Sequence, residues 1–207
     1  MNVALEQLIS DLIKDEALRT PEIIDAFRSV DRKMFVLPEH QLEAYGDYPL
    51  PIGYGQTISQ PTTVAMMLEW LRPEAGQKIL DVGSGSGWTT ALLARIVGTK
   101  GKAIGVEIIP ELVSFGQKNL AKFNFPQAKI IQAGKILGHS PEAPYDRILV
   151  SAASQKLPQE LVDQLAIGGT MIIPIGNSIF RIRKKSETNI SREEFPGFVF
   201  VPLVALQ

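Results

Sequence analysis

Hydrophobic residues recur at helical spacing through the first third of the chain. A first predicted helix carries its apolar residues three or four positions apart, at Leu5, Leu8, Ile9, Leu12 and Ile13. A second predicted helix begins at Thr20-Pro21, because a threonine followed by proline is a common helix start. Residues 35–60 lose this periodicity and are rich in proline and glycine, yet their apolar content indicates an ordered segment. Another helix is predicted to begin near Pro61.

After residue 76 the pattern changes to alternating strands and helices. Strands are predicted at 78–82, 103–107, 129–132, 147–151 and 170–175, and helices at 86–97, 111–123 and 158–165. This alternation predicts an α/β fold with a mostly parallel open sheet, helices on both faces and an N-terminal helical extension. Segments 180–183 and 198–204, on either side of a polar loop, are predicted to form a closing pair of edge strands.

Composition and charge narrow the classes of function. The 207 residues include 21 basic and 22 acidic side chains, a balance that makes a nucleic-acid partner improbable. The chain has no cysteine, which excludes disulfides, thiolate metal sites and a cysteine nucleophile. We see neither a secretory signal nor a membrane-spanning apolar stretch, and we expect a cytoplasmic protein without a metal site or a membrane partner.

A glycine-rich loop joins the first of these strands to its helix. Its residues, Asp81-Val82-Gly83-Ser84-Gly85-Ser86-Gly87, lie where glycine lets the backbone approach a ligand closely. A dinucleotide fingerprint would need a sixth-position glycine, and that position is Trp88. Glu107 ends the next predicted strand, where a carboxylate can accept two ribose hydroxyls. Asp81 has two equally weighted interpretations, as a cofactor contact and as a structural acceptor for loop amides.

The alternate glycines with the upstream acid resemble the S-adenosylmethionine motif of the Rossmann-like methyltransferases. A more specific resemblance follows from Pro49-Leu50-Pro51-Ile52-Gly53-Tyr54-Gly55-Gln56-Thr57-Ile58-Ser59-Gln60-Pro61, which is similar to the signature of the protein-L-isoaspartate O-methyltransferases. Further matching runs are Val30-Asp31-Arg32-Lys33-Met34-Phe35-Val36, Ser151-Ala152-Ala153, Ile173-Pro174-Ile175-Gly176 and Phe200-Val201-Pro202-Leu203. The resemblance therefore extends over essentially the whole chain.

This resemblance implies a function and a set of site residues. S-adenosylmethionine would donate a methyl group to the free α-carboxyl of isoaspartyl residues in damaged proteins, leaving S-adenosylhomocysteine. Ser59 would hydrogen-bond the reacting carboxylate, and Thr57 and Ile58 would shape the substrate site. The implied cofactor-binding residues are Asp81, Gly83, Ser84, Gly85, Gly87, Glu107, Ile108, Ala133 and Gly134. We expect a single monomeric domain, with helices and a substrate-side loop in 1–60 and the cofactor-binding core in 61–207.

Two observations leave alternatives open. Ser59 precedes Pro61 and is also a suitable helix N-cap. After the third strand the family usually carries an acid that receives the adenine amino group, whereas this chain has Ala133-Gly134-Lys135. An ammonium only donates hydrogen bonds, so Lys135 cannot replace that acid. The alternatives to an isoaspartyl repair enzyme are a methyltransferase acting on another carboxylate or dedicated peptide, and a homologue that binds S-adenosylmethionine without catalysis.

Overall fold

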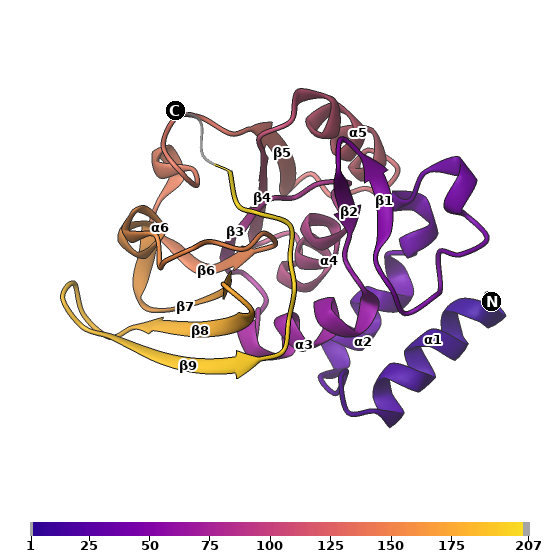
Figure 1. The fold of residues 1–207 in the computed structure, drawn as a ribbon, viewed down its shortest axis with the longest axis horizontal. Coiled ribbons are helices and arrows are strands. Elements are labelled where there is room, and N and C mark those ends of the chain that lie inside the picture. The colour runs from indigo at the N-terminus through magenta and orange to yellow at the C-terminus, as the bar shows by residue number, and fades with distance from the viewer. Residues whose placement is uncertain (1, 205–207) are drawn as a thin grey trace.

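A seven-stranded sheet forms the centre of the molecule, described here over residues 2–204 of a computed structural model (Figure 1). Its strand order is β5-β4-β3-β6-β7-β8-β9, and the strands from β5 to β7 are parallel. Their bounds are β3 (Lys78–Val82), β4 (Lys102–Glu107), β5 (Ala128–Gln132), β6 (Tyr145–Val150), β7 (Leu165–Ile175), β8 (Ser178–Lys184) and β9 (Ile190–Pro196). The predicted mostly parallel open sheet is confirmed.

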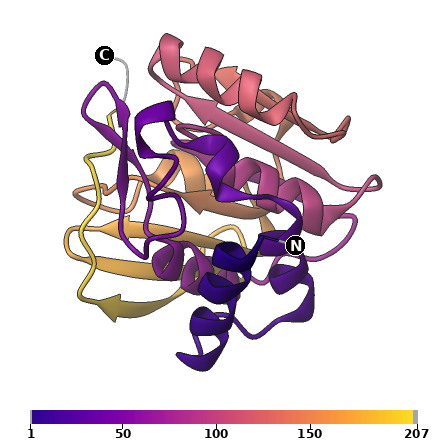
Figure 2. The same cartoon turned by 90° about the vertical axis from the view of Figure 1, so that its right-hand side faces the viewer.

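Helices cover both faces of this sheet. Successive strand residues point to opposite sides, so neighbouring residues of one strand pack against different helices. Ile79 packs in the core that includes α3 (Pro61–Leu71), α4 (Trp88–Val97) and α5 (Pro110–Leu120). Leu80 points to the other face and packs with residues of α6 (Gln159–Gln164). The N-terminal extension consists of α1 (Val3–Lys14) and α2 (Pro21–Ser29), which join the core on the α4 side (Figure 2).

The proline-rich stretch before α3 is an ordered arrangement of short elements. Two 3-10 helices, η1 (Arg32–Phe35) and η2 (Pro38–His40), are followed by an antiparallel hairpin of β1 (Leu50–Gly53) and β2 (Gln56–Ile58). Tyr54 closes the hairpin turn with a φ of 55°, between two glycines that also have positive φ. The expected order of this segment is confirmed, although the sequence pattern did not predict its elements.

The prediction of an edge strand at 198–204 is wrong. The strand that pairs with β8 is β9, built from the polar segment Ile190–Pro196. Gly197 then turns the chain with a φ of 96°, and the amides of Gly197 and Phe198 both donate to the Asn177 carbonyl. Residues 198–204, which we call the C-terminal strap, leave the sheet plane and cross to Ala153, which forms an isolated bridge with Pro202 (Figure 1).

The sheet topology fixes where a ligand can bind. From β3 the chain proceeds to β4 and β5 on one side, and later returns to place β6 on the other side of β3. In open α/β sheets, ligands bind at the carboxyl ends of the strands beside such a reversal of order. The glycine loop follows β3, and Glu107 is the last residue of β4, so both lie at this edge.

Candidate functional site

A cavity of about 310 Å³ lies at the carboxyl ends of the parallel strands. Segments far apart in the sequence form its walls: the β1–β2 hairpin, the glycine loop with the start of α4, the loops after β4, β5 and β6, and the C-terminal strap. Lining residues include Thr57, Ile58, Ser59, Gly83, Ser84, Gly85, Trp88, Thr89, Glu107, Ile108, Ala133, Gly134, Leu137, Gly138, Ser151, Ala152 and Val201. This volume is within the range of ordinary small-molecule sites.

The glycine loop is held mainly by hydrogen bonds to the neighbouring strand β4. The amides of Gly83 and Ser84 both donate to the Val106 carbonyl, and the amide of Gly87 donates to the Ser84 carbonyl. A Cβ atom at Gly87 would lie 2.7 Å from Ile130 Cδ1, and the residue has a φ of 88°, so only glycine fits there. Gly87 does not line the cavity: it is the N-cap of α4 and lets that helix approach α5.

Glu107 is the most firmly held polar side chain on the cavity wall. Its Oε1 accepts hydrogen bonds from the amides of Ile108 at 2.8 Å and Ile109 at 3.0 Å. Its Oε2 accepts from the Gly85 amide at 2.9 Å. These bonds tie the end of β4 to the glycine loop, and Oε2 retains a lone pair that can accept a further hydrogen bond.

Asp81 lies behind the cavity and takes no part in lining it. Its Oδ2 accepts from the Thr89 hydroxyl at 2.7 Å and the Thr90 hydroxyl at 2.6 Å, which anchors the first turn of α4 to β3. Complete burial raises the pKa of Asp81 to about 6, against the two hydroxyl bonds, and the nearby charge of Glu107 adds to the rise. These contacts give Asp81 a structural role, but one made through two hydroxyls of α4 and not through the loop amides that the sequence suggested.

Ser59 lies between β2 and α3 on the hairpin side of the cavity. The N-cap of α3 is Gln60, and no side chain forms a cap bond from that position. Instead Asp47 accepts from the Thr62 amide at 2.8 Å and the Thr62 hydroxyl at 2.7 Å. The helix-cap interpretation of Ser59 is therefore wrong, because the carboxylate of Asp47 bonds the first turn in its place.

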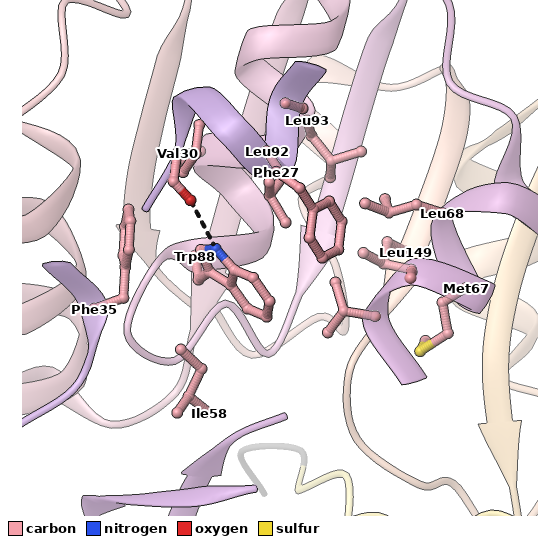
Figure 3. Packing of buried hydrophobic residues seen from close by; sticks show 14 of the residues in the cluster. Phe27, Val30, Phe35, Ile58, Met67, Leu68, Trp88, Leu92, Leu93 and Leu149 are labelled. Carbon is pink, nitrogen blue, oxygen red and sulfur yellow. Dashed lines mark hydrogen bonds between the residues drawn. The ribbon is translucent and has the colours of Figure 1, made fainter. Parts of the chain in front are cut away.

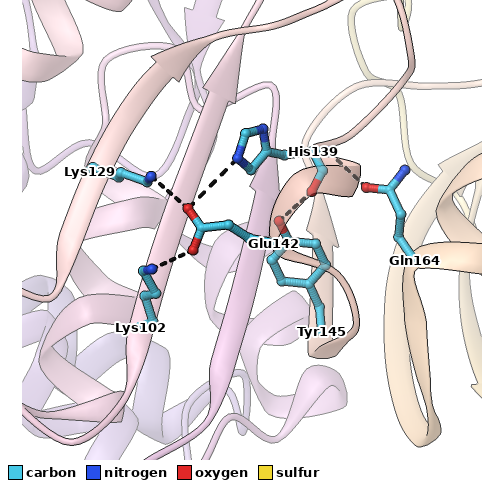
Figure 4. A network of polar contacts seen from close by, with 6 residues as sticks. All are labelled: Lys102, Lys129, His139, Glu142, Tyr145 and Gln164. Atoms are coloured by element: carbon cyan, nitrogen blue, oxygen red, sulfur yellow. Dashed lines mark hydrogen bonds and ion pairs between the residues drawn. The ribbon is translucent and has the colours of Figure 1, made fainter.

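The crossover between β5 and β6 lines the cavity with its first residues. Its later residues are held by side chains of α6, β4, β5 and β6. Gln164 of α6 donates to the Leu137 carbonyl at 2.7 Å. It also accepts from the His139 amide at 2.7 Å (Figure 4). Tyr145 donates its hydroxyl to the His139 carbonyl at 2.6 Å. Ion pairs from Lys102 and Lys129 to Glu142 complete the network. The polar contacts thus fix a crossover that has only the short η3 (Ser140–Glu142) as regular structure.

The lining residues fit an adenosyl cofactor. Ser84 Oγ is buried and, within residues 2–204, has no hydrogen-bond partner in the protein, so it is available to a ligand. A Cβ atom at Gly85 would approach Ile52 Cδ1 to 3.1 Å, and the glycine keeps that space between loop and hairpin open. The carboxylate of Glu107 suits ribose hydroxyls, and Ile108 and Leu137 offer apolar walls for a base.

Comparison with known proteins assigns the family. The family model for protein-L-isoaspartate(D-aspartate) O-methyltransferase (PCMT) matches residues 3–207. The chain belongs to this family. Protein-L-isoaspartate O-methyltransferases from Thermococcus onnurineus and Methanopyrus kandleri are 42% and 41% identical to it, over 95% and 97% of this chain and 91% of each relative. A Plasmodium falciparum PCMT structure in complex with S-adenosyl-L-homocysteine has a TM-score of 0.86 and 28% identity, covering 96% of this chain and 97% of that one.

Most site residues predicted from the PCMT resemblance meet at one cavity. Thr57, Ile58 and Ser59 form its hairpin side, and the cofactor candidates on its other walls are Gly83, Ser84, Gly85, Glu107, Ile108, Ala133 and Gly134. Asp81 and Gly87 are the two candidates that do not line it. Sequence reasoning missed the C-terminal strap as a wall, although the match of residues 200–203 to the PCMT pattern was an available signal.

Two kinds of feature are absent from the described part of the chain. Within residues 2–204, no cluster of three or more His, Asp or Glu side chains is arranged to hold a metal ion. In the same part of the chain, no helix has both the length and the apolar character needed to cross a membrane.

Proposed function

We propose that this chain transfers a methyl group from S-adenosylmethionine to the free α-carboxyl of L-isoaspartyl residues in damaged proteins and peptides. The observation that carries the proposal is the single cavity that joins the Thr57–Ser59 wall to the glycine loop and Glu107. Membership of the PCMT family supplies the substrate class, which fold similarity by itself cannot do.

Glu107, Ser84 and the glycine loop would hold the cofactor. Glu107 would accept a hydrogen bond from one ribose hydroxyl at the free lone pair of Oε2. The Ser84 hydroxyl, which has no protein partner within residues 2–204, would donate to or accept from the bound molecule. Ile108 and Leu137 would offer apolar walls to the base, with Ala133 and Gly134 on the same cavity wall. Bound S-adenosylmethionine supplies an electrophilic methyl group on a sulfonium centre.

The protein's own contribution is mainly positioning. A carboxylate is ionised near pH 7, so the substrate can act as nucleophile without a general base. Ser59 donates its hydroxyl to one oxygen of that carboxylate, and Thr57 and Ile58 hold the peptide beside it. The hairpin and the C-terminal strap form two walls of the cavity in which the reacting groups would meet. Such alignment of two bound reactants accounts for large rate factors without any proton transfer.

The resulting ester would close spontaneously to a succinimide as the backbone amide nitrogen displaces methanol, and hydrolysis of the succinimide would give normal aspartate in part.

We further propose that the chain acts as a cytoplasmic monomer on protein substrates alone, with neither nucleic acid nor membrane as partner. Residues 1–60 would supply the substrate side and residues 61–207 the cofactor-binding core of one domain. The hairpin and α3 share a hydrophobic core with α4, which supports this single-domain assignment.

A methyl-transfer assay with labelled S-adenosylmethionine tests the function. An isoaspartyl peptide and its normal aspartyl twin differ only in which carboxyl is free, so the comparison isolates recognition of the α-carboxyl. We expect transfer to the isoaspartyl peptide alone. Equal transfer to both peptides would contradict isoaspartyl specificity, and transfer to neither, with S-adenosylhomocysteine still bound, would favour a binding protein without catalysis.

A further inference from the structure

Three consecutive residues at the start of η1 connect the substrate side of the molecule to the cofactor side. The Val30 carbonyl accepts a hydrogen bond from Trp88 Nε1 at 3.3 Å (Figure 3). Both carboxylate oxygens of Asp31 lie 2.9 Å from the Tyr45 hydroxyl. Arg32 is 1% exposed and makes the largest set of contacts of the three. None of these contacts is needed by the proposed chemistry. Val30 contacts the start of α4, whereas Asp31 and Arg32 contact the segment that ends at Ser59.

The guanidinium of Arg32 donates to four backbone carbonyl oxygens. Its Nη1 bonds Ala44 O at 2.8 Å and Gly46 O at 3.2 Å. Its Nη2 bonds Tyr48 O at 2.9 Å and Ser59 O at 3.1 Å. One side chain therefore links the loop before β1 to the residue after β2, so that the ends of the hairpin are held together.

Ser59 is consequently fixed from two sides. Arg32 binds its carbonyl oxygen, and Asp47 binds the chain just after it, through Gln60 Nε2 at 3.1 Å and the Thr62 amide at 2.8 Å. Burial lowers the pKa of Arg32 to about 10, and the nearby charge of Asp47 acts in the opposite direction. A rotation of the Ser59 backbone, which would move its hydroxyl, would break bonds on both sides.

Trp88 gives this arrangement a fixed position relative to the cofactor loop. The Arg32 guanidinium lies over the Trp88 ring, 5.5 Å from its centroid, within the range of cation–π contacts. Trp88 is the first residue of α4 and directly follows Gly87. Figure 3 shows its ring between η1 and Ile58 of β2, in the hydrophobic cluster. The same guanidinium therefore lies over the Trp88 ring, next to the glycine loop, and donates a hydrogen bond to the Ser59 carbonyl.

The geometry points to Arg32 as a positioning residue for methyl transfer, which sets the place of the Ser59 hydroxyl relative to the methyl donor. This inference rests on the proposed function. A planar fork with five N–H donors can serve four carbonyls at once, whereas the compact ammonium of lysine has three donors in a different geometry. Arg32→Lys keeps the positive charge but cannot form the four carbonyl bonds at once. We therefore expect Ser59 to be displaced, while the glycine loop and Glu107 keep their positions.

Arg147→Lys is the matched control. Arg147 also donates to backbone carbonyls, Leu71 O at 2.9 Å, Arg72 O at 3.1 Å and Asp146 O at 2.9 Å, at the opposite end of α3 from Ser59. The measurements are kcat and KM with an isoaspartyl peptide, the Kd for S-adenosylhomocysteine by calorimetry, and thermal unfolding. Ser59→Ala provides the reference for loss of the hydroxyl itself.

For Arg32→Lys we expect kcat to fall roughly ten- to hundredfold, as misplacement of a reacting group does, with the S-adenosylhomocysteine Kd within about twofold of wild type. Arg147→Lys should lower the unfolding temperature by a similar amount and leave kcat unchanged.

Equal kcat values for the two variants, or an effect of Arg32→Lys on KM alone, would overturn the inference. Arg32→Gln, which keeps a planar amide donor, replaces Arg32→Lys should the latter not fold. Failure of both to fold would assign Arg32 to stability alone and also overturn it. A wild-type protein without transfer to the peptide would refute the proposed function instead.

Discussion

Ala133 lies on the cavity wall directly after β5, and its amide donates to the Glu107 carbonyl at 2.8 Å. In the PCMT pattern an acid at this place accepts the amino group of adenine. We expect Ala133→Asp to lower the Kd for S-adenosylhomocysteine several-fold, because a hydrogen bond to a charged acceptor contributes on the order of 1 kcal/mol or more. Calorimetry measures the change directly.

Ala133→Asn is the control for this substitution, since it has the same shape without the charge, and its gain in affinity should be smaller. Unchanged or weaker binding by Ala133→Asp would mean that a backbone carbonyl in residues 134–138 already accepts the amino group. The cost of burying a second carboxylate near Glu107 would give the same result. Ala133 would then be a neutral variation in this family.

Residue identities in the site were predictable where a motif specifies them. The signature around Ser59 and the glycine loop predicted positions that the structure brings to one cavity. The roles of Asp81 and Gly87 were not predictable, because each depends on packing: Asp81 bonds two threonines of α4, and Gly87 admits Ile130 of β5. The motif predicts that these residues lie in the turn between strand and helix. It does not predict which of them face the ligand.

Elements were predicted well where hydrophobic periodicity is strong, as in the parallel strands, and poorly in the tail. In the strap, residues 201–204 line the cavity, and Phe198 and Phe200 pack against the hydrophobic core. Ile190–Pro196 is polar because it forms the exposed sheet edge. Hydrophobicity therefore marked the wrong segment as a strand. Pro202, which has no N–H to donate, was a local signal against a paired strand.

Glu142, in the η3 crossover between β5 and β6, should make the stability of the protein depend on pH. Hydrogen bonds from Lys102 and then Lys129 lower the pKa of Glu142 from its ordinary 4.5 to about 2. A carboxylate whose pKa is lower in the folded state contributes stability above its unfolded pKa, and loses that contribution as the pH falls through the folded value. Because water reaches Glu142, we expect the contribution to be about 1 kcal/mol.

Glu142→Gln should accordingly lower the free energy of unfolding by about 1 kcal/mol at pH 7, and the difference from wild type should shrink between about pH 4.5 and pH 2. Urea denaturation across this range measures it. Glu74→Gln is the control, because Glu74 lies 4.0 Å from its cation and is 72% exposed. A difference at Glu142 that stays constant down to pH 2 would show that the ion pairs are not its source.

At the scale of the whole molecule, the reversal of strand order at β3 brings together segments that are more than a hundred residues apart. The hairpin before α3 and the strap after β9 meet over the carboxyl ends of β3, β4 and β6, where the glycine loop and Glu107 lie. A cofactor on one side and a carboxylate on the other are thereby enclosed in one space. The fold would align the cofactor with the substrate carboxylate, and Ser59, Ser84 and Glu107 would bind their polar groups.

The most direct test of this account follows the fate of an isoaspartyl peptide incubated with the protein and S-adenosylmethionine. Chromatography separates the isoaspartyl peptide from its aspartyl twin, and mass spectrometry detects the methyl ester. We predict a methyl ester on the isoaspartyl residue, its replacement by succinimide, and accumulation of the aspartyl peptide only when S-adenosylmethionine is present. A stable methyl group at another position, or methylation without any aspartyl product, would contradict the account.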